Sequence, residues 1–278
     1  MVTTRAMRIR KLWTRMRWVA QAARGHLEQL DAVRRGYTSA LSWRDHAARE
    51  EGPDRANPLR TFFDARTQGR GIWKWDHYFD VYDRHFHQFR GRDVHVLEIG
   101  IYSGGSLEMW KDYFGPRCQV YGVDIEPACQ AYEGDSVKVF IGDQADRSFW
   151  QRFRSEAPAL DIVIDDGGHL LEQQIVTLEE LLPHLQPGGV YLCEDVHGAF
   201  NGFASYVHGL AHQLNAFELA EDDPDNNERR SVCKTTEFQS AVQAIHLYPF
   251  VTVIERSPAP IPELVAPKHG TEWETFLK

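Results

Sequence analysis

From residue 94 onward, short apolar runs alternate with longer segments in which apolar residues recur every three or four positions. The first pattern is typical of buried strands and the second of amphipathic helices. Strands are predicted at 94–100, 119–124, 137–143, 160–166 and 190–195, and helices at 106–114, 147–156, 171–185 and 203–219. Strands that alternate with helices of this length predict a parallel sheet with right-handed crossovers.

Two further predicted strands, 244–250 and 251–257, follow each other almost without a gap. A parallel pair needs a crossover of roughly a dozen residues, so these two strands are expected to pair antiparallel. Five parallel strands completed by an antiparallel hairpin resemble the sheet of class I methyltransferases. The predicted fold is therefore α/β and Rossmann-like, with a seven-stranded, mainly parallel sheet and a C-terminal antiparallel hairpin.

The first 60 residues differ from the rest in charge. They contain 13 Lys and Arg against 6 Asp and Glu, whereas the remaining residues contain 18 and 34. We expect residues 1–60 to form a basic helical extension that ends in a linker at 50–58, and residues 61–278 to form the main domain. The acid-free segment 1–23 has the pattern of a basic amphipathic helix. Packing on the body, packing on a second subunit or disorder is expected for it, and contact with an anionic membrane is the alternative.

Composition excludes several classes of protein. No run approaches the roughly eighteen apolar residues of a transmembrane helix, and the start lacks the pattern of a secretory signal. The four cysteines form no CxxC pair, which indicates reduced thiols and argues against a zinc site built on them. The acidic main domain argues against a nucleic-acid partner. We therefore expect a cytoplasmic protein.

A glycine-rich turn, EIGIYSGG (98–105), joins the first predicted strand to the first predicted helix. Glycines at this place in a Rossmann-like sheet let the backbone approach a nucleotide. A dinucleotide enzyme would have GxGxxG here. GxxxGG with an acid two residues earlier suits S-adenosylmethionine instead, because that molecule carries an ammonium group and no phosphate. Glu98, Gly100, Tyr102 and Gly104 are the predicted contacts.

Acidic residues also end the next two predicted strands. Asp124 follows Gly100 by 24 positions, where a carboxylate accepts hydrogen bonds from ribose hydroxyls. Asp143 and the adjacent Gln144 end the third strand and are predicted to meet the adenine. A helix N-cap is the alternative for each acid, but acids at three successive strand ends favour a nucleotide site.

The fourth and fifth predicted strands end in DDGGH (165–169) and EDVH (194–197). Adjacent strands lie about 5 Å apart, so Asp166 is expected close to Glu194 and Asp195. Three carboxylates without a thiolate suit Mg²⁺ or another hard divalent cation. Such a cation would also offset their mutual repulsion.

The segments LEIGIYSGGSLEMW, VYGVDI, IDDGGH and GGVYLCEDVH together resemble the macrocin-type family of sugar O-methyltransferases, over roughly residues 70–257. The resemblance implies an enzyme of antibiotic biosynthesis that forms homo-oligomers and methylates a hydroxylated small molecule, a sugar or glycoside. It implies that Asp166, Glu194 and Asp195 bind Mg²⁺ and that His169 is the general base. The family often has Ser where this chain has Gly168.

The mechanism implied is metal-assisted O-methylation. Mg²⁺ binds two oxygens of a diol or catechol and acidifies one hydroxyl. His169 accepts the proton, because imidazole titrates near neutral pH. His197 is a candidate contact for substrate or for the metal site. The aromatic segment that contains Tyr78 and Tyr82 is expected to pack on the sheet, with a substrate contact as the alternative for His77.

Other functions compete with this interpretation. An NAD-dependent oxidoreductase is disfavoured by the glycine spacing, the carboxylates and the terminal hairpin. A cephalosporin-hydroxylase-like relative and a phenol or catechol O-methyltransferase are nearer alternatives. A membrane- or partner-binding scaffold on a methyltransferase core is the non-enzymatic one. The segment before residue 94 and the acidic loop 218–230 are the expected substrate-selecting regions.

Overall fold

The computed structural model describes residues 28–43, 56–216, 230–267 and 269–272. The chain divides into two units, 1–54 and 55–278. In the first unit, residues 28–41 form a helix with exposed side chains. The predicted basic helix 1–23 lies outside the described residues, and so does most of the predicted linker.

The second unit begins with helix α2 (Pro58–Ala65), which is capped by the side chain of Asn57. Leu59 in this helix is fully buried. The predicted domain boundary after residue 60 therefore falls inside a helix that packs with the main body. Within the described part of the chain, no helix is long and apolar enough to cross a membrane.

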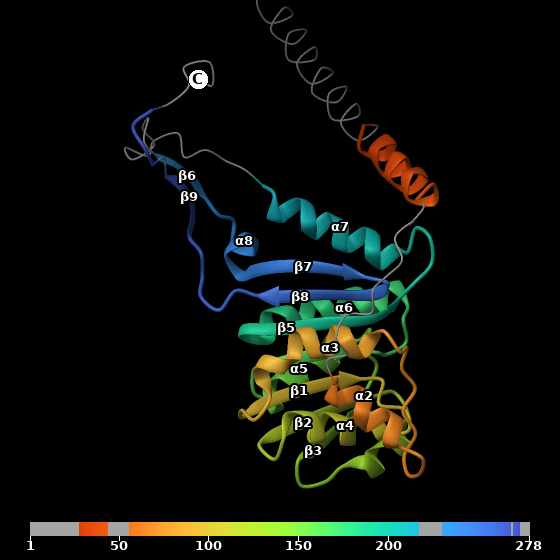
Figure 1. Ribbon diagram of the computed structural model, residues 1–278. Coiled ribbons are helices and arrows are strands. Elements are labelled where there is room, and N and C mark those ends of the chain that lie inside the picture. Colours follow the sequence, from red (N-terminus) through yellow and green to blue (C-terminus); the bar gives the residue numbers. More distant parts are fainter. Residues whose placement is uncertain (1–27, 44–55, 217–229, 268, 273–278) are drawn as a thin grey trace, which may run out of the picture. The chain divides into compact units, whose positions relative to one another are not determined.

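A seven-stranded sheet of order β3-β2-β1-β4-β5-β8-β7 forms the centre of the second unit (Figure 1). Strands β1 to β5 run parallel, and β8 pairs antiparallel with both β5 and β7. The strands are β1 (Val94–Ile99), β2 (Cys118–Asp124), β3 (Val137–Ile141), β4 (Leu160–Asp165), β5 (Leu185–Val196), β7 (Val242–Tyr248) and β8 (Phe250–Arg256). The predicted Rossmann-like sheet with its terminal hairpin is confirmed.

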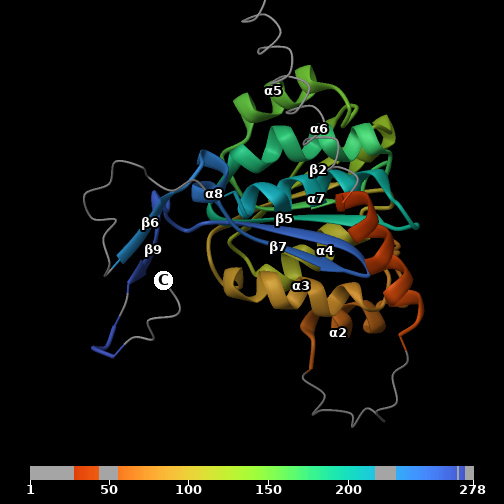
Figure 2. The same cartoon turned by 90° about the horizontal axis from the view of Figure 1, so that it is seen from above.

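Helices cover both faces of this sheet, α2, α3 and α4 on one side and α5, α6 and α7 on the other (Figure 2). The helices are α3 (Tyr78–Phe86), α4 (Gly105–Phe114), α5 (Arg147–Glu156), α6 (Leu171–Leu181), α7 (Gly202–Leu214) and the short α8 (Glu237–Ala241). In β1, Val94 and Val96 pack in the hydrophobic core on the side of α2, α3 and α4. Leu97 and Ile99 pack in the core on the side of α5, α6 and α7. Side chains alternate along a strand, so apolar runs without polar alternation produce a sheet that is buried on both faces.

The structure differs from the predicted elements at several boundaries. The predicted helix 171–185 ends at Leu181 and continues as a 3-10 turn, η3 (Leu182–His184), because Pro183 has no N–H to extend the helix. Two strands that the pattern did not predict, β6 (Arg230–Lys234) and β9 (Glu263–Pro267), form a separate antiparallel sheet. Two further 3-10 turns are η1 (His87–Phe89) and η2 (Pro127–Tyr132). Nearly all of the acidic loop 218–230 lies outside the described residues.

Candidate active site

A cavity of about 860 Å³ lies at the carboxyl ends of the parallel strands. Its walls are the loops that follow β1 to β5, together with residues 71–75, which precede α3. Ligands of open α/β sheets bind at this edge, because the strand-to-helix loops converge there. The predicted residues that line it are Gly100, Tyr102, Asp124, Asp143, Gln144, Asp166, His169, Glu194, Asp195 and His197.

The turn after β1 depends on a glycine. Gly100 has a φ of +82°, and a Cβ at this position would lie 2.0 Å from the carbonyl oxygen of Asp166. The loop after β1 can therefore pack on the loop after β4 only without a side chain at residue 100. Gly104, the other predicted glycine contact, is the N-cap of α4 and does not line the cavity.

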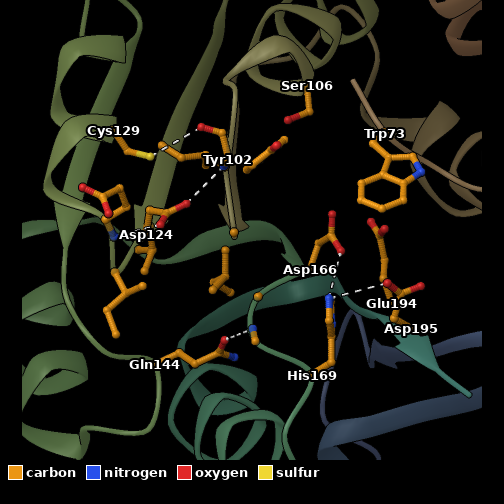
Figure 3. A pocket seen from close by; sticks show the side chains of 18 of the residues that line it. Trp73, Tyr102, Ser106, Asp124, Cys129, Gln144, Asp166, His169, Glu194 and Asp195 are labelled. Carbon is orange, nitrogen blue, oxygen red and sulfur yellow. Dashed lines mark hydrogen bonds and ion pairs between the residues drawn. The ribbon is translucent and has the colours of Figure 1, made fainter. Parts of the chain in front are cut away.

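Tyr102 and Asp124 are joined at the end of the cavity shown on the left of Figure 3. The Tyr102 backbone N–H donates to Asp124 Oδ2 at 3.1 Å, and the Glu126 N–H donates to Asp124 Oδ1 at 2.9 Å. These bonds hold the carboxylate in place on the cavity wall. The next predicted contact, Asp143, accepts a hydrogen bond from the Ala145 N–H at 2.8 Å and lines the same cavity.

Glu98 lies beneath the cavity rather than on its surface. Its side chain is fully buried and accepts a hydrogen bond from Ser106 Oγ at 2.6 Å. The positively charged group next to Glu98 is a side chain of the protein itself: Lys74 Nζ lies 3.3 Å from Glu98 Oε1. Burial raises the pKa of Glu98, and Lys74 opposes that shift. The predicted contact with a cofactor ammonium stays a prediction.

The three predicted metal ligands are brought together by the strand register. Asp165 of β4 pairs with Cys193 of β5, so Asp166 and Glu194, the next residue in each chain segment, are neighbours. Asp195 follows Glu194. His169 Nε2 lies 3.5 Å from Asp195 Oδ2 and 3.9 Å from Asp166 Oδ1 (Figure 3).

Lys74 is a site residue that the sequence analysis missed. Its Nζ lies 2.6 Å from Asp166 Oδ2 and 3.0 Å from Glu194 Oε1, and its side chain is only 3% exposed. Burial lowers the pKa of Lys74, but the three surrounding carboxylates outweigh it and hold that pKa well above its usual value. A single lysine inside the aromatic run GIWKWDHYF was the signal for it. Lys74 therefore neutralises part of the carboxylate cluster from within the fold.

Aromatic residues before the sheet also reach the carboxylates. Tyr82 donates from its hydroxyl to Glu194 Oε1 at 2.7 Å, and Tyr78 donates to Asp195 Oδ1 at 2.7 Å. Trp75 Nε1 donates to the same Asp195 oxygen at 3.1 Å. Both tyrosines are buried against the sheet, as expected, and their hydroxyls in addition orient two predicted metal ligands. His77 does not line the cavity, and its Nε2 lies 2.9 Å from the Pro249 carbonyl oxygen.

The donor set fits a hard divalent cation. Ligand atoms of Asp166, His169 and Asp195 all lie within 4.8 Å of one another. Lys74 takes one oxygen of Asp166, and Tyr78 and Trp75 take one of Asp195. One carboxylate oxygen of Asp166 and one of Asp195 therefore remain for a cation. Carboxylate oxygens are the ligands that Mg²⁺ prefers. Glu194 has both oxygens within 3.1 Å of Lys74 Nζ, so its participation requires that contact to loosen.

The loop that carries His169 is held from below by Gln144. The Gly168 N–H donates to Gln144 Oε1 at 2.7 Å, and Gln144 Nε2 donates to Asp165 Oδ1 at 3.0 Å and to Thr177 Oγ1 at 3.1 Å. Gln144 is almost fully buried, so it fixes this loop in addition to lining the cavity. Burial raises the pKa of Asp165 to about 6.

Three predicted site residues have strained backbones. Tyr102, His169 and Asp195 have φ values of 42°, 56° and 55°, in the left-handed region that residues with a side chain seldom adopt. Such strain persists where the surrounding structure imposes it, and it is concentrated at functional sites. The strain here falls on the loops after β1 and β4 and on the end of β5, which line one cavity.

Comparison with known proteins agrees with this geometry. Residues 97–196 match the family model for a methyltransferase domain. Demethylmacrocin O-methyltransferase of Streptomyces fradiae is 41% identical over 137 residues, which are 46% of this chain and 34% of that protein. Mycinamicin VI 2''-O-methyltransferase of Micromonospora griseorubida is 41% identical over 126 residues, 43% of this chain and 31% of that protein. The predicted resemblance to macrocin-type sugar O-methyltransferases is confirmed.

A solved structure extends the similarity beyond this segment. The MycE methyltransferase from the mycinamycin biosynthetic pathway, in complex with Mg and SAH, is 29% identical, with a TM-score of 0.57 over 72% of this chain and 54% of that one. A second structure of MycE holds Mg, SAH and mycinamycin VI, at 28% identity and the same TM-score, over 74% and 55% of the two chains. The matches thus span about a third of the curated relatives' length and about half of the solved chain.

Proposed function

We propose that this chain, whose residues 97–196 match a methyltransferase domain, is an S-adenosylmethionine- and Mg²⁺-dependent O-methyltransferase that acts on a hydroxyl of a sugar or glycosylated natural product. One observation carries the proposal. A single cavity has Tyr102 and Asp124 at one end and Asp166, His169 and Asp195 at the other (Figure 3). A donor and an acceptor bound in one cavity can be held at near-attack distance, which is a large part of the rate gain available to group transfer.

The end of the cavity at Asp124 is the proposed cofactor site. Asp124, held by the Tyr102 N–H, accepts hydrogen bonds from the ribose hydroxyls. The loop after β3, with Asp143 and Gln144, faces the adenine. Glu98 and Gly104 do not line the cavity. Glu98 acts on this site through its ion pair with Lys74, and Gly104 acts through the start of α4.

Asp166 and Asp195 are the proposed primary ligands of the cation, with Glu194 as a third ligand when its contact with Lys74 loosens. When bound, the cation acidifies a substrate hydroxyl and S-adenosylmethionine supplies the methyl group. Tyr78 and Trp75 fix Asp195 through its Oδ1, which leaves Oδ2 directed toward His169.

His169 is the proposed general base. Its side chain is 35% exposed on the cavity wall, so a substrate hydroxyl can reach it. Nε2 accepts the hydroxyl proton, and the Asp195 carboxylate 3.5 Å away stabilises the imidazolium that results. The strained backbone of His169 and the Gln144 bond to the preceding amide hold the ring in this place.

Aromatic side chains at the cavity support a glycosylated acceptor. Trp73 lines the cavity with 89% of its surface exposed, and Tyr102 lines it with 76% exposed. Exposed indole and phenol rings offer flat apolar faces with a polar edge, which suit the faces of sugar rings and of an apolar aglycone. We propose a cytoplasmic location, because Cys118, Cys129 and Cys193 are free thiols.

The test is methyl transfer from isotopically labelled S-adenosylmethionine to a panel of glycosylated macrolides, sugar nucleotides and catechols. We expect a singly methylated glycoside by mass spectrometry, its loss with EDTA and its recovery with Mg²⁺. Methylation of catechols alone would move the acceptor to the phenol class. Calorimetric binding of NAD without binding of S-adenosylmethionine would overturn the function, and transfer indifferent to chelation would overturn the role of the metal.

A further inference from the structure

A second group of metal-ligand side chains lies away from the cavity, between α3 and the C-terminal hairpin. His85 comes from α3, His246 from β7 and Glu255 from β8. One ligand atom from each lies within 4.8 Å of the other two, and none of the three lines the cavity. We propose that these three residues form a binding site for Zn²⁺ or a similar late first-row divalent cation.

The fold brings the three residues to one place for a simple reason. Ala244 of β7 pairs with Glu255 of β8, and His246 lies two positions farther along β7, so its side chain is on the same face as Glu255. Val253 lies on this face too and packs in the core that contains Phe86 of α3. His85, adjacent to Phe86 in the sequence, is buried in the same layer.

The distances are close to those of a metal site. His85 Nδ1 lies 2.7 Å from Glu255 Oε1, and His246 Nε2 lies 3.3 Å from Glu255 Oε2. His246 Nε2 is buried and has no hydrogen bond of acceptable geometry within the described part of the chain. Ligand atoms that surround Zn²⁺ tetrahedrally at about 2.0–2.1 Å lie roughly 3.3 Å from one another. Small side-chain rotations are therefore enough to admit the ion.

The orientation of His85 supports metal binding. Its second ring nitrogen, Nε2, lies 2.9 Å from the Tyr248 hydroxyl. A histidine that binds a metal through one nitrogen usually donates from the other to a fixed acceptor, which sets its tautomer. With the proton on Nε2 and donated to Tyr248, Nδ1 presents its lone pair toward Glu255 and His246.

The kind of ligand selects the metal. Two imidazoles and one carboxylate suit Zn²⁺, Co²⁺ or Ni²⁺, whereas Mg²⁺ prefers oxygen ligands alone. The His85 side chain is 3% exposed, Glu255 24% and His246 36%, so solvent reaches the cluster from the side of β7, the edge strand of the sheet. Three protein ligands leave one coordination position for water.

Occupation of this site would stabilise α3. The same helix carries Tyr78 and Tyr82, which donate to Asp195 and Glu194. A metal that joins His85 to the hairpin therefore braces one wall of the cavity. Without a metal, the hydrogen bonds of His85 to Glu255 and Tyr248 would join α3 to the hairpin, and this is the alternative explanation of the cluster.

The experiment is a Co²⁺ titration of the untagged full-length protein in excess MgCl₂, followed by visible absorption and by competition with Zn²⁺. Mg²⁺ occupies the all-oxygen positions and leaves a histidine site free for Co²⁺. We expect one equivalent of Co²⁺ to give visible bands that Zn²⁺ abolishes, and Zn²⁺ to raise the thermal midpoint. The same titration in an Asp166→Asn variant, in which the carboxylate site is weakened, should give the same bands.

Two variants and a matched control decide the assignment. His246→Gln and Glu255→Gln should each weaken Co²⁺ binding by about tenfold or more, and His208→Gln, at an exposed histidine of α7, should leave it unchanged. Circular dichroism checks that each variant is folded. Absence of a Mg²⁺-insensitive site in the wild type, or binding that survives both His246→Gln and Glu255→Gln, would overturn the proposal and leave the hydrogen-bonded connection as the explanation.

Discussion

Lys74 Nζ lies 2.6 Å from Asp166 Oδ2, although the two residues are 92 positions apart in the chain. The same ammonium lies 3.0 Å from Glu194 and 3.3 Å from Glu98. One buried lysine thus neutralises carboxylates from the ends of β1, β4 and β5. The segment before α3 is thereby tied to the loops that carry the proposed metal ligands.

Replacement of Lys74 by Met should destabilise the protein strongly in the absence of Mg²⁺. Removal of one partner from a buried charge cluster costs about 3–5 kcal/mol, because the remaining charges have no compensation. Mg²⁺ should restore part of the loss, since a cation can then neutralise the same oxygens. Urea unfolding with and without MgCl₂ measures both effects. Lys138→Met is the control, because its exposed pair with Glu156 contributes less than about 1 kcal/mol. An equal loss in the two variants would contradict this role for Lys74.

The contrast between Lys74 and Asp166 shows what could be predicted from the sequence. Asp166 ends a run of apolar residues, and parallel strands place all their carboxyl ends at one edge, so pattern alone locates it. Lys74 lies in an aromatic segment whose local pattern predicts only packing. Its position depends on tertiary contacts with residues far away in the chain. The pairing of β6 with β9 was missed for the same reason, since the whole β7–β8 hairpin lies between them in the chain.

The position of the loop after β4 could be predicted from the sequence, but the side chain that holds this loop could not. The motif DDGGH indicates a strand-end site, and the structure puts it on the cavity wall. Nothing in that motif reveals that Gln144, 24 residues earlier than Gly168, holds the Gly168 amide. Gln144 was predicted as an adenine contact from its place after β3. That contact stays a prediction, and the three hydrogen bonds that fix this buried amide depend on tertiary packing that the linear pattern does not contain.

His169→Ala should lower kcat by about 10²–10⁴, the usual contribution of a general base. The dissociation constant for S-adenosylhomocysteine should not change, because the predicted cofactor end of the cavity is at Asp124. His197→Ala is the matched control, since His197 lines the same cavity but has no ion-pair distance to Asp166 or Asp195 in the described structure. Steady-state rates and calorimetry measure the two quantities. A comparable kcat loss in both variants would remove the distinction on which the assignment of the base rests.

Asp124→Ala should weaken binding of S-adenosylhomocysteine by about ten- to a hundredfold. Hydrogen bonds to a charged group contribute about 1.5–3 kcal/mol, and 1.4 kcal/mol is a factor of ten in affinity. The control is Asp146→Ala, which removes the N-cap of α5 and should cost about 1 kcal/mol of stability without affecting affinity. Calorimetry at equal ligand concentrations compares the two. Unchanged affinity in Asp124→Ala would show that the ribose lies elsewhere.

Gly100→Ala should abolish cofactor binding and destabilise the fold far more than Gly91→Ala. Both glycines have positive φ, +82° and +70°, so both substitutions carry a backbone cost of about 1–2 kcal/mol. Only at Gly100 would the new Cβ collide with backbone, the Asp166 carbonyl at 2.0 Å, whereas at Gly91 it would have nothing within 4 Å. Urea unfolding of both variants separates collision from backbone strain. Equal destabilisation would mean that the two loops can move apart without cost.

Stability below neutral pH should depend on His184, which follows α6 in η3. Burial lowers the pKa of His184, and the nearby Arg154 lowers it further, while backbone carbonyls of residues 157 and 158 oppose the shift. The unfolded chain therefore takes up a proton first, near pH 6.5. The contribution of His184 to stability is fully present above that pH and is lost as the pH falls toward its folded pKa.

His184→Leu should thus lose less stability than the wild type between about pH 7 and pH 5.5. The raised pKa of Asp165 acts in the opposite direction in both proteins and cancels in the comparison. Urea unfolding across this range measures the difference, with exposed His208→Leu expected to follow the wild type. Parallel curves for His184→Leu and the wild type would mean that the pKa of His184 is the same in the folded and unfolded chains.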